Sequence, residues 1–164
     1  MSAPFPAPSM SSYEISCDPA RLDIDAIHDF LSRSYWAAGI PKSVVERAIA
    51  NSLCFGVYRE GQQVGLARVI TDRATFAYLS DVYILPEHRA QGLAKRVLEE
   101  VIGHPELQGL RRMLLFTRDA HTLYAKFGFK PLAHPERVMD LLFPDVYGTS
   151  QGDGPLAADP HTRR

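Results

Sequence analysis

In the segment 81–102 the spacing of the apolar residues changes at Gly92, from that of a strand to that of a helix. Strand-forming side chains lead to Pro86, which blocks further ladder pairing, and Gly92 permits backbone conformations that are closed to residues with a Cβ atom. From Leu93 to Ile102 the apolar residues recur at helical spacing, and Gly103 favours the end of a helix. We therefore expect a strand, a tight turn and an amphipathic helix, and hence a fold that packs helices against a sheet.

The turn in this segment is a candidate anion site. The first amides of a helix, here from Ala90 to Ala94, have no partner inside the helix and lie at the positive end of its dipole. Arg89 adds a full positive charge beside them. A pyrophosphate would suit such a cradle, although Arg-x-x-Gly-x-Ala alone also fits an ordinary strand-to-helix connection.

Bulk properties exclude several classes of protein. The 164 residues fit one domain, and the formal net charge of -1 provides no basic field for nucleic acid or an anionic membrane. Neither a leader-like start nor an apolar run long enough to span a bilayer is present, so we expect a cytoplasmic protein whose two cysteines are reduced. No metal-ligand spacing stands out, and we predict no metal.

The remaining periodicities predict an antiparallel meander followed by a parallel unit, within a domain spanning residues 12–147. Asp119 is the expected N-cap of the last helix. Proline- and glycine-rich compositions predict a flexible arm over residues 1–11 and a flexible tail over residues 148–164. The expected strands are 13–17, 53–58, 63–70, 76–85, 112–117 and 138–143, and the expected helices begin near Ile24, at about Lys42, at Leu93 and at Ala120.

Tyr35 and Trp36 lie between the first two expected helices. Two aromatic side chains at a helix end can brace the two helices against each other. They can also form the wall of a substrate pocket, because loops of this kind often overhang one. The sequence leaves both interpretations open.

Two motifs, taken together with the expected meander that precedes them, resemble the GNAT superfamily of acetyl-coenzyme A-dependent acetyltransferases. The segment Arg89–Ala94 matches the family's Gln/Arg-x-x-Gly-x-Gly/Ala, and Leu123-Tyr124 followed by Gly128-Phe129 matches a second family motif. The resemblance runs from about Tyr13 to Phe143. It implies an α/β (α+β) fold with a mixed, mostly antiparallel central sheet of six to seven strands, about four helices, and splayed fourth and fifth strands.

The resemblance also implies a binding site for acetyl-coenzyme A in the gap between those strands. Loop amides would hold the pyrophosphate, and the fourth strand would pair with the pantetheine arm and polarise the thioester carbonyl. Tyr124 matches the family position that is credited as general acid toward the departing thiolate; a packed helix tyrosine is the other interpretation. The implied binding residues are Val82, Tyr83, Ile84, Arg89, Ala90, Gln91, Gly92, Leu93, Ala94 and Tyr124.

The general base is not assigned by the resemblance. Tyr78 stands where some relatives carry a glutamate, and Thr117 stands where many carry an asparagine that contacts the cofactor. Asp81 and His121 are the remaining titratable candidates near the expected pocket, and a chain of water molecules is a third. Structural roles for both side chains stay open.

The expected reaction is direct transfer of an acetyl group from acetyl-coenzyme A to a primary amine of a small molecule or a protein. No Ser-His-Asp or Cys-His arrangement is evident, so we expect no covalent enzyme intermediate. The alternative is a non-catalytic acyl-coenzyme A-binding regulatory module. A nucleotide-binding domain is a weaker third interpretation, because the loop lacks a Walker lysine. Monomer and homodimer are both compatible with the sequence.

Overall fold

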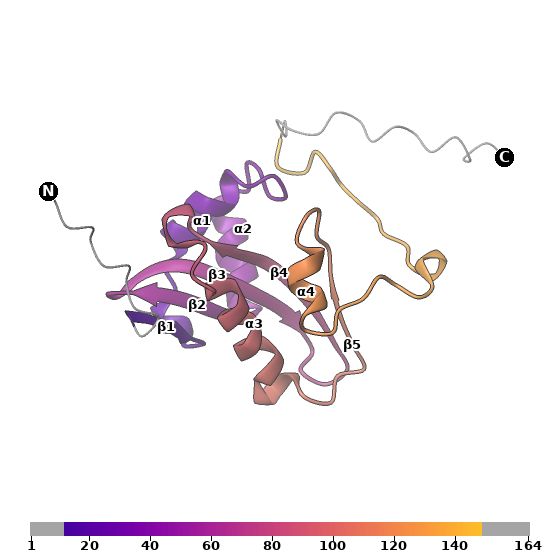
Figure 1. Ribbon diagram of the computed structural model, residues 1–164. Helices are drawn as coiled ribbons and strands as arrows, with labels where there is room; N and C mark the ends of the chain where they lie inside the picture. The colour runs from indigo at the N-terminus through magenta and orange to yellow at the C-terminus, as the bar shows by residue number, and fades with distance from the viewer. Residues whose placement is uncertain (1–11, 149–164) are drawn as a thin grey trace, which may run out of the picture.

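The computed structural model describes residues 12–148. The expected arm over residues 1–11 and nearly all of the expected tail lie outside this range. The described chain forms one five-stranded sheet with helices on both faces (Figure 1). In chain order the elements are β1 (Tyr13–Ser16), α1 (Ile24–Ser32), α2 (Lys42–Ala50), β2 (Leu53–Arg59), β3 (Gln62–Thr71), β4 (Phe76–Ile84), α3 (Leu93–Gly103), β5 (Arg112–Leu115) and α4 (His121–Ala125), with short 3-10 turns between several of them.

The strands follow one another in the sheet in the order β1-β2-β3-β4-β5. The first four are antiparallel, and β5 joins β4 in parallel after the crossover through α3. The expected meander and parallel unit are confirmed. The expected six to seven strands are wrong, because this sheet has five.

The predicted strand 138–143 does not form. Residues 138–143 have no regular secondary structure, and most of their side chains are exposed. The apolar run that predicted the strand is present in the sequence, but a strand also needs a neighbour that completes its backbone hydrogen bonds. Within residues 12–148 this segment has no such neighbour. The sequence of this segment therefore indicated that it could form a strand, but it did not indicate a neighbouring strand to pair with.

Two apolar cores lie on opposite faces of the sheet. One face carries Phe55, Val57, Ala67 and Val69 and packs against the apolar stripe of α3. The other carries Cys54, Leu66 and Tyr83 and packs against α1 and α2; its helical contributors are Ile27, Leu31, Val45 and Ile49. Alternating side chains along β2 and β3 supply both cores, as the period of a strand requires.

Strand β4 changes the phase of this alternation at a β-bulge. Ala77 and Leu79 face the α3 side before the bulge, and Ile84 faces it afterwards. The register against β3 shifts between Leu66 and Arg68, and Asp81 has a φ of 47°. One extra residue in β4 accounts for both observations.

Strands β4 and β5 pair only at the start of β4. The parallel ladder joins Phe76–Leu79 to Arg112–Leu115 and then stops, while β4 continues to Ile84 along β3. The edge of β4 that faces β5 is therefore open from the bulge onwards. This opening agrees with the expected separation of the fourth and fifth strands.

Candidate functional site

The turn between β4 and α3 has the geometry of an anion-binding cradle. Gly92 is the N-cap of α3, with a left-handed φ of 73°, and no side chain of the described residues caps the helix. Ala90 also has a positive φ, of 59°. Left-handed residues at alternating positions turn successive amides toward one side, which is how backbone nests bind anions. The first turn of α3 therefore presents amide donors and the positive end of its dipole.

Arg89 begins this turn, and one nitrogen of its side chain is already hydrogen-bonded within the protein. Its Nε donates a hydrogen bond of 2.8 Å to the carbonyl oxygen of Ile84, the last residue of β4. This bond ties the loop to the end of the strand and leaves the terminal guanidinium nitrogens as further donors. Arg89 thus fixes the cradle to the open end of β4.

Val82, Tyr83 and Ile84 form the part of β4 that has no β5 neighbour. Their backbone pairs with β3 on one side, through Leu66 with Tyr83 and Gly65 with Ile84. The ring of Tyr83 points to the α1 side, where it stacks on Phe30 with ring centroids 3.8 Å apart. This ring is structural, so what Tyr83 can offer to a ligand in the gap is its main chain.

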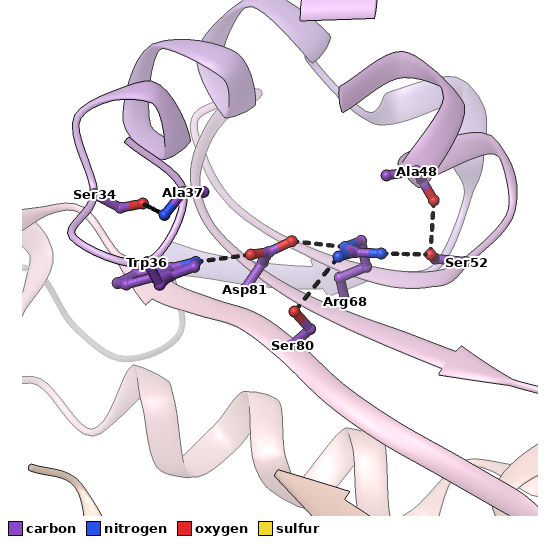
Figure 2. Close-up of polar contacts among 8 residues, drawn as sticks. All are labelled: Ser34, Trp36, Ala37, Ala48, Ser52, Arg68, Ser80 and Asp81. Atoms are coloured by element: carbon purple, nitrogen blue, oxygen red, sulfur yellow. Dashed lines mark hydrogen bonds and ion pairs between the residues drawn. The ribbon is translucent and has the colours of Figure 1, made fainter. Parts of the chain in front are cut away.

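Asp81 lies at the bulge, and both of its carboxylate oxygens are engaged (Figure 2). One oxygen accepts from Nε of Arg68 at 2.6 Å, and the other accepts from Nε1 of Trp36 at 2.8 Å. The ion pair is largely buried, since the side chains of Arg68 and Asp81 are 14% and 7% exposed. Arg68 also donates to Ser52 and Ser80. Asp81 thus holds the α1–α2 loop against β4.

The loop carrying Tyr35 and Trp36 reaches across to the β5–α4 connection. The two rings meet edge to face, with centroids 5.0 Å apart, and about half of each side chain is exposed. The guanidinium of Arg118, which follows β5, lies 3.8 Å above the ring of Tyr35. These contacts form an aromatic wall over the side of the sheet where β4 and β5 part.

Tyr124 lies on α4, on the face of the sheet that α3 covers. Its ring contacts that core and meets Phe129 edge to face at 5.9 Å. Burial, with smaller contributions from Tyr35 and Asp119, raises the pKa of the Tyr124 hydroxyl to about 12. The phenol therefore keeps its proton at neutral pH, as a proton donor must.

His121 is the first residue of α4 and is exposed. It lines the same cavity as Tyr124 and Thr117, a cavity of about 790 Å³ along β5. Asp119 is not the N-cap of α4, contrary to expectation. Ala120 holds that position, and its amide donates instead to Oγ1 of Thr117 at 3.0 Å.

The two cysteines lie outside this site. Cys54 is buried in β2 among the residues that face α1 and α2, and burial raises the pKa of its thiol to about 12. Cys17 follows β1 and is half-buried, and burial again raises its pKa. Both thiols are therefore protonated and poorly nucleophilic near neutral pH.

Two residues of the site were missed from the sequence. Arg68 had a signal, because it is a charge within the otherwise apolar run of β3, and a buried charge needs a partner. Arg118 had none, since an arginine in a connection is ordinarily solvated. Among residues 12–148 no group of three or more His, Cys, Asp and Glu side chains is placed to hold a metal, and no helix there is long and apolar enough to cross a membrane.

Comparison with known proteins agrees with this fold. The family model described as the acetyltransferase (GNAT) domain matches residues 50–131, half of the chain. A Gibberella zeae protein named as a candidate acetyltransferase is 41% identical over 137 residues, which is 70% of this chain and 76% of that protein. The chain belongs to the GNAT family of acetyltransferases.

Solved structures support the same assignment. A GNAT-family protein from Xanthomonas campestris is 51% identical, with a TM-score of 0.82 over 84% of this chain and 97% of that one. A Clostridium acetobutylicum protein solved with acetyl-CoA is 17% identical, with a TM-score of 0.58 over 79% of this chain and 94% of its own. That second likeness concerns the fold alone.

The ion pair at the bulge makes a prediction about stability. We expect Asp81→Asn to lower the free energy of unfolding by about 3 kcal/mol, because it leaves the Arg68 guanidinium buried without a counter-charge. Asp29→Asn is the matched control: it breaks the exposed pair with Arg33 and should cost less than about 0.5 kcal/mol. Urea denaturation of the two variants would measure both. Equal effects would show that the bulge does not depend on this pair.

Proposed function

We propose that this protein transfers an acetyl group from acetyl-coenzyme A to a primary amine by direct attack of the amine on the thioester. The observation that carries the proposal is the uncapped, left-handed turn at Gly92, placed at the end of a strand whose β5-facing edge is open. The residues proposed to bind the coenzyme are those expected from the sequence, with Arg89–Ala94 at the pyrophosphate and the main chain of Val82, Tyr83 and Ile84 along the pantetheine arm.

Backbone dipoles would supply the electrostatic part of catalysis. A main-chain amide in the open part of β4, aimed at the thioester carbonyl, stabilises the negative charge that develops on its oxygen as the amine adds. The β-bulge sets which amides face the gap, because it shifts the phase of β4 by one residue. The protonated, weakly nucleophilic state of both cysteines supports direct attack over an acyl-enzyme.

The proton transfers are assigned to residues around α4. The amine must be neutral to attack; as its nitrogen bonds to the carbonyl carbon, the carbon–sulfur bond breaks and the amine gives up a proton. We propose that Tyr124 donates its phenolic proton to the departing sulfur. His121, directly or through water, is the proposed acceptor of the amine proton.

Asp81 is better suited to hold the aromatic wall of Tyr35 and Trp36 in place than to act as the general base. Both of its oxygens already accept hydrogen bonds, one of them from a buried guanidinium. We propose that Tyr35 and Trp36 contact the acceptor and that Asp81 fixes this loop through Trp36. The aromatic rings and the Arg118 guanidinium would favour an acceptor with an apolar body or a carboxylate.

The proposed function is tested by acceptor-dependent release of the coenzyme A thiol. We expect coenzyme A to bind in titration calorimetry and free thiol to appear only when a suitable member of a panel of amines is present. Gly92→Val should weaken coenzyme A binding at least about tenfold, since a β-branched residue strains the left-handed cradle. Tight binding with no acceptor-dependent release would instead support the regulatory-module alternative.

Tyr124→Phe separates turnover from binding. We expect kcat to fall at least about 100-fold while the affinity for coenzyme A changes little, because only the proton donor is lost. Tyr58→Phe is the matched control, since its hydroxyl lies in β2 without a hydrogen-bond partner among the described residues. With a pKa of about 12, Tyr124 should cause no loss of activity between pH 7 and about 10. An unchanged kcat would remove the proposed acid.

His121→Ala tests the proposed base through the pH dependence of kcat/KM. We expect the acidic limb of the wild-type profile, where a protonated imidazole cannot accept a proton, to disappear or move in the variant. His134→Ala is a suitable control, because that side chain is exposed and paired with Glu136, away from α4. Retention of the wild-type limb in His121→Ala would assign the proton transfer to water.

A further inference from the structure

The guanidinium of Arg118 is held by one of its faces. Its central carbon lies 3.8 Å from the centre of the Tyr35 ring. A stacked guanidinium keeps its N–H groups in its own plane, so contact with a ring leaves them available as donors at the edge. Among residues 12–148, no carboxylate lies within ion-pair distance of Arg118, and its side chain donates no hydrogen bond. Arg118 therefore presents a positively charged fork of donors.

Arg68, the other arginine of this region, is in the opposite situation. Its guanidinium pairs with Asp81 and also donates to Ser52 and Ser80 (Figure 2). The negative charge of Asp81 is neutralised by this pair, so it does not repel an anion that approaches the aromatic wall. The charge that remains without a counter-charge among the described residues is that of Arg118.

The rings of Tyr35 and Trp36 provide an apolar surface next to this charge. Their side chains are 47% and 42% exposed, although both rings are fixed in place. Trp36 is held by its hydrogen bond to Asp81, and Tyr35 is held beneath Arg118. Fixed aromatic rings beside a few polar groups are the usual lining of a small-molecule site. The wall thus combines an apolar area with one cationic edge.

This wall borders the proposed acid. Burial raises the pKa of Tyr124, and Tyr35 and then Asp119 add to the rise because both lie near its hydroxyl. Tyr35 therefore connects Arg118 to the place where the sulfur departs. The exposed carboxylate of Asp119 favours a cationic group over an anionic one at that end. The charges thus orient a ligand with its anionic group at Arg118 and its amine toward Tyr124.

We propose that the acceptor is a free amino acid with an apolar side chain, whose carboxylate binds the edge of the Arg118 guanidinium and whose side chain lies on the rings of Tyr35 and Trp36. This inference rests on the proposed acetyl transfer and names its acceptor. A guanidinium and a carboxylate form two parallel, charge-assisted hydrogen bonds, which gives both strength and orientation. The α-amine forms the bond to the acetyl carbon, and the carboxylate is unchanged in the product.

The test compares amines that differ by a carboxylate alone. Phenylalanine with phenethylamine, and leucine with isoamylamine, are two such pairs, and both enantiomers of each amino acid are supplied. The members of a pair differ in the basicity of their amines, so the quantity compared is the kcat/KM ratio within a pair in the wild type and in Arg118→Ala, where basicity cancels. We expect the variant to lose at least about tenfold in this ratio, as for the loss of a hydrogen bond between charged groups.

Further variants separate carboxylate binding from a structural role of Arg118. Arg118→Lys keeps the charge without the planar fork and should retain part of the ratio, whereas Arg118→Glu should lower it further by repelling the carboxylate. Arg47→Ala is the matched control, because it removes an exposed arginine of α2 and should leave the ratio unchanged. If Arg118 served to brace Tyr35 alone, Arg118→Ala would slow both members of each pair equally. An unchanged ratio would therefore overturn the proposal.

A binding measurement distinguishes failure of this proposal from failure of the proposed function. N-acetylphenylalanine, in both enantiomers, and N-acetylphenethylamine are titrated by calorimetry into protein saturated with coenzyme A, which requires no turnover. We expect one enantiomer of the acetylated amino acid to bind at least about tenfold more tightly than the compound without a carboxylate, and Arg118→Ala to remove the difference. Absence of thiol release with every amine would count against acetyl transfer. Equal affinities, or no binding of either compound, would overturn the carboxylate site at Arg118.

Discussion

The ion pair between Asp81 and Arg68 is the constraint on which the site depends. A residue with a positive φ in the middle of a strand is strained unless its surroundings hold it, and here a largely buried guanidinium does so. The bulge that results changes which residues of β4 face α3. It also falls two residues after the β4–β5 ladder ends at Leu79. The same local feature thus coincides with the opening of the sheet and anchors the loop that carries Trp36.

The local parts of this fold could be predicted because their signals are local. The turn at Gly92 and the helix after it were expected from a glycine followed by a helical repeat, and the structure has that helix from Leu93 to Gly103. The hairpin of β2 and β3 was expected from two apolar runs around Glu60-Gly61, and it is present. Each of these elements carries its own stop and start residues, so tertiary context had little to change.

The features that were predicted wrongly or missed depend on partners that are distant in sequence. The segment 138–143 has a strand pattern but no ladder in the single chain, so the strand count was wrong. The bulge in β4 was missed because nearly every residue from Phe76 to Leu85 is apolar, which hides a change of phase. Only the adjacent polar residues Ser80 and Asp81 hint at it. The contact of Arg118 with Tyr35 joins two loops and leaves no periodic trace.

The position of Cys54 has a practical consequence. A chromogenic disulfide reagent reports free thiolate, and the only two protein thiols are one buried in a sheet and one half-buried beside β1, both with raised pKa values. The folded protein should therefore add little background colour when such a reagent is used to follow coenzyme A. For the same reason its thiols should be slow to form mixed disulfides with oxidised coenzyme A.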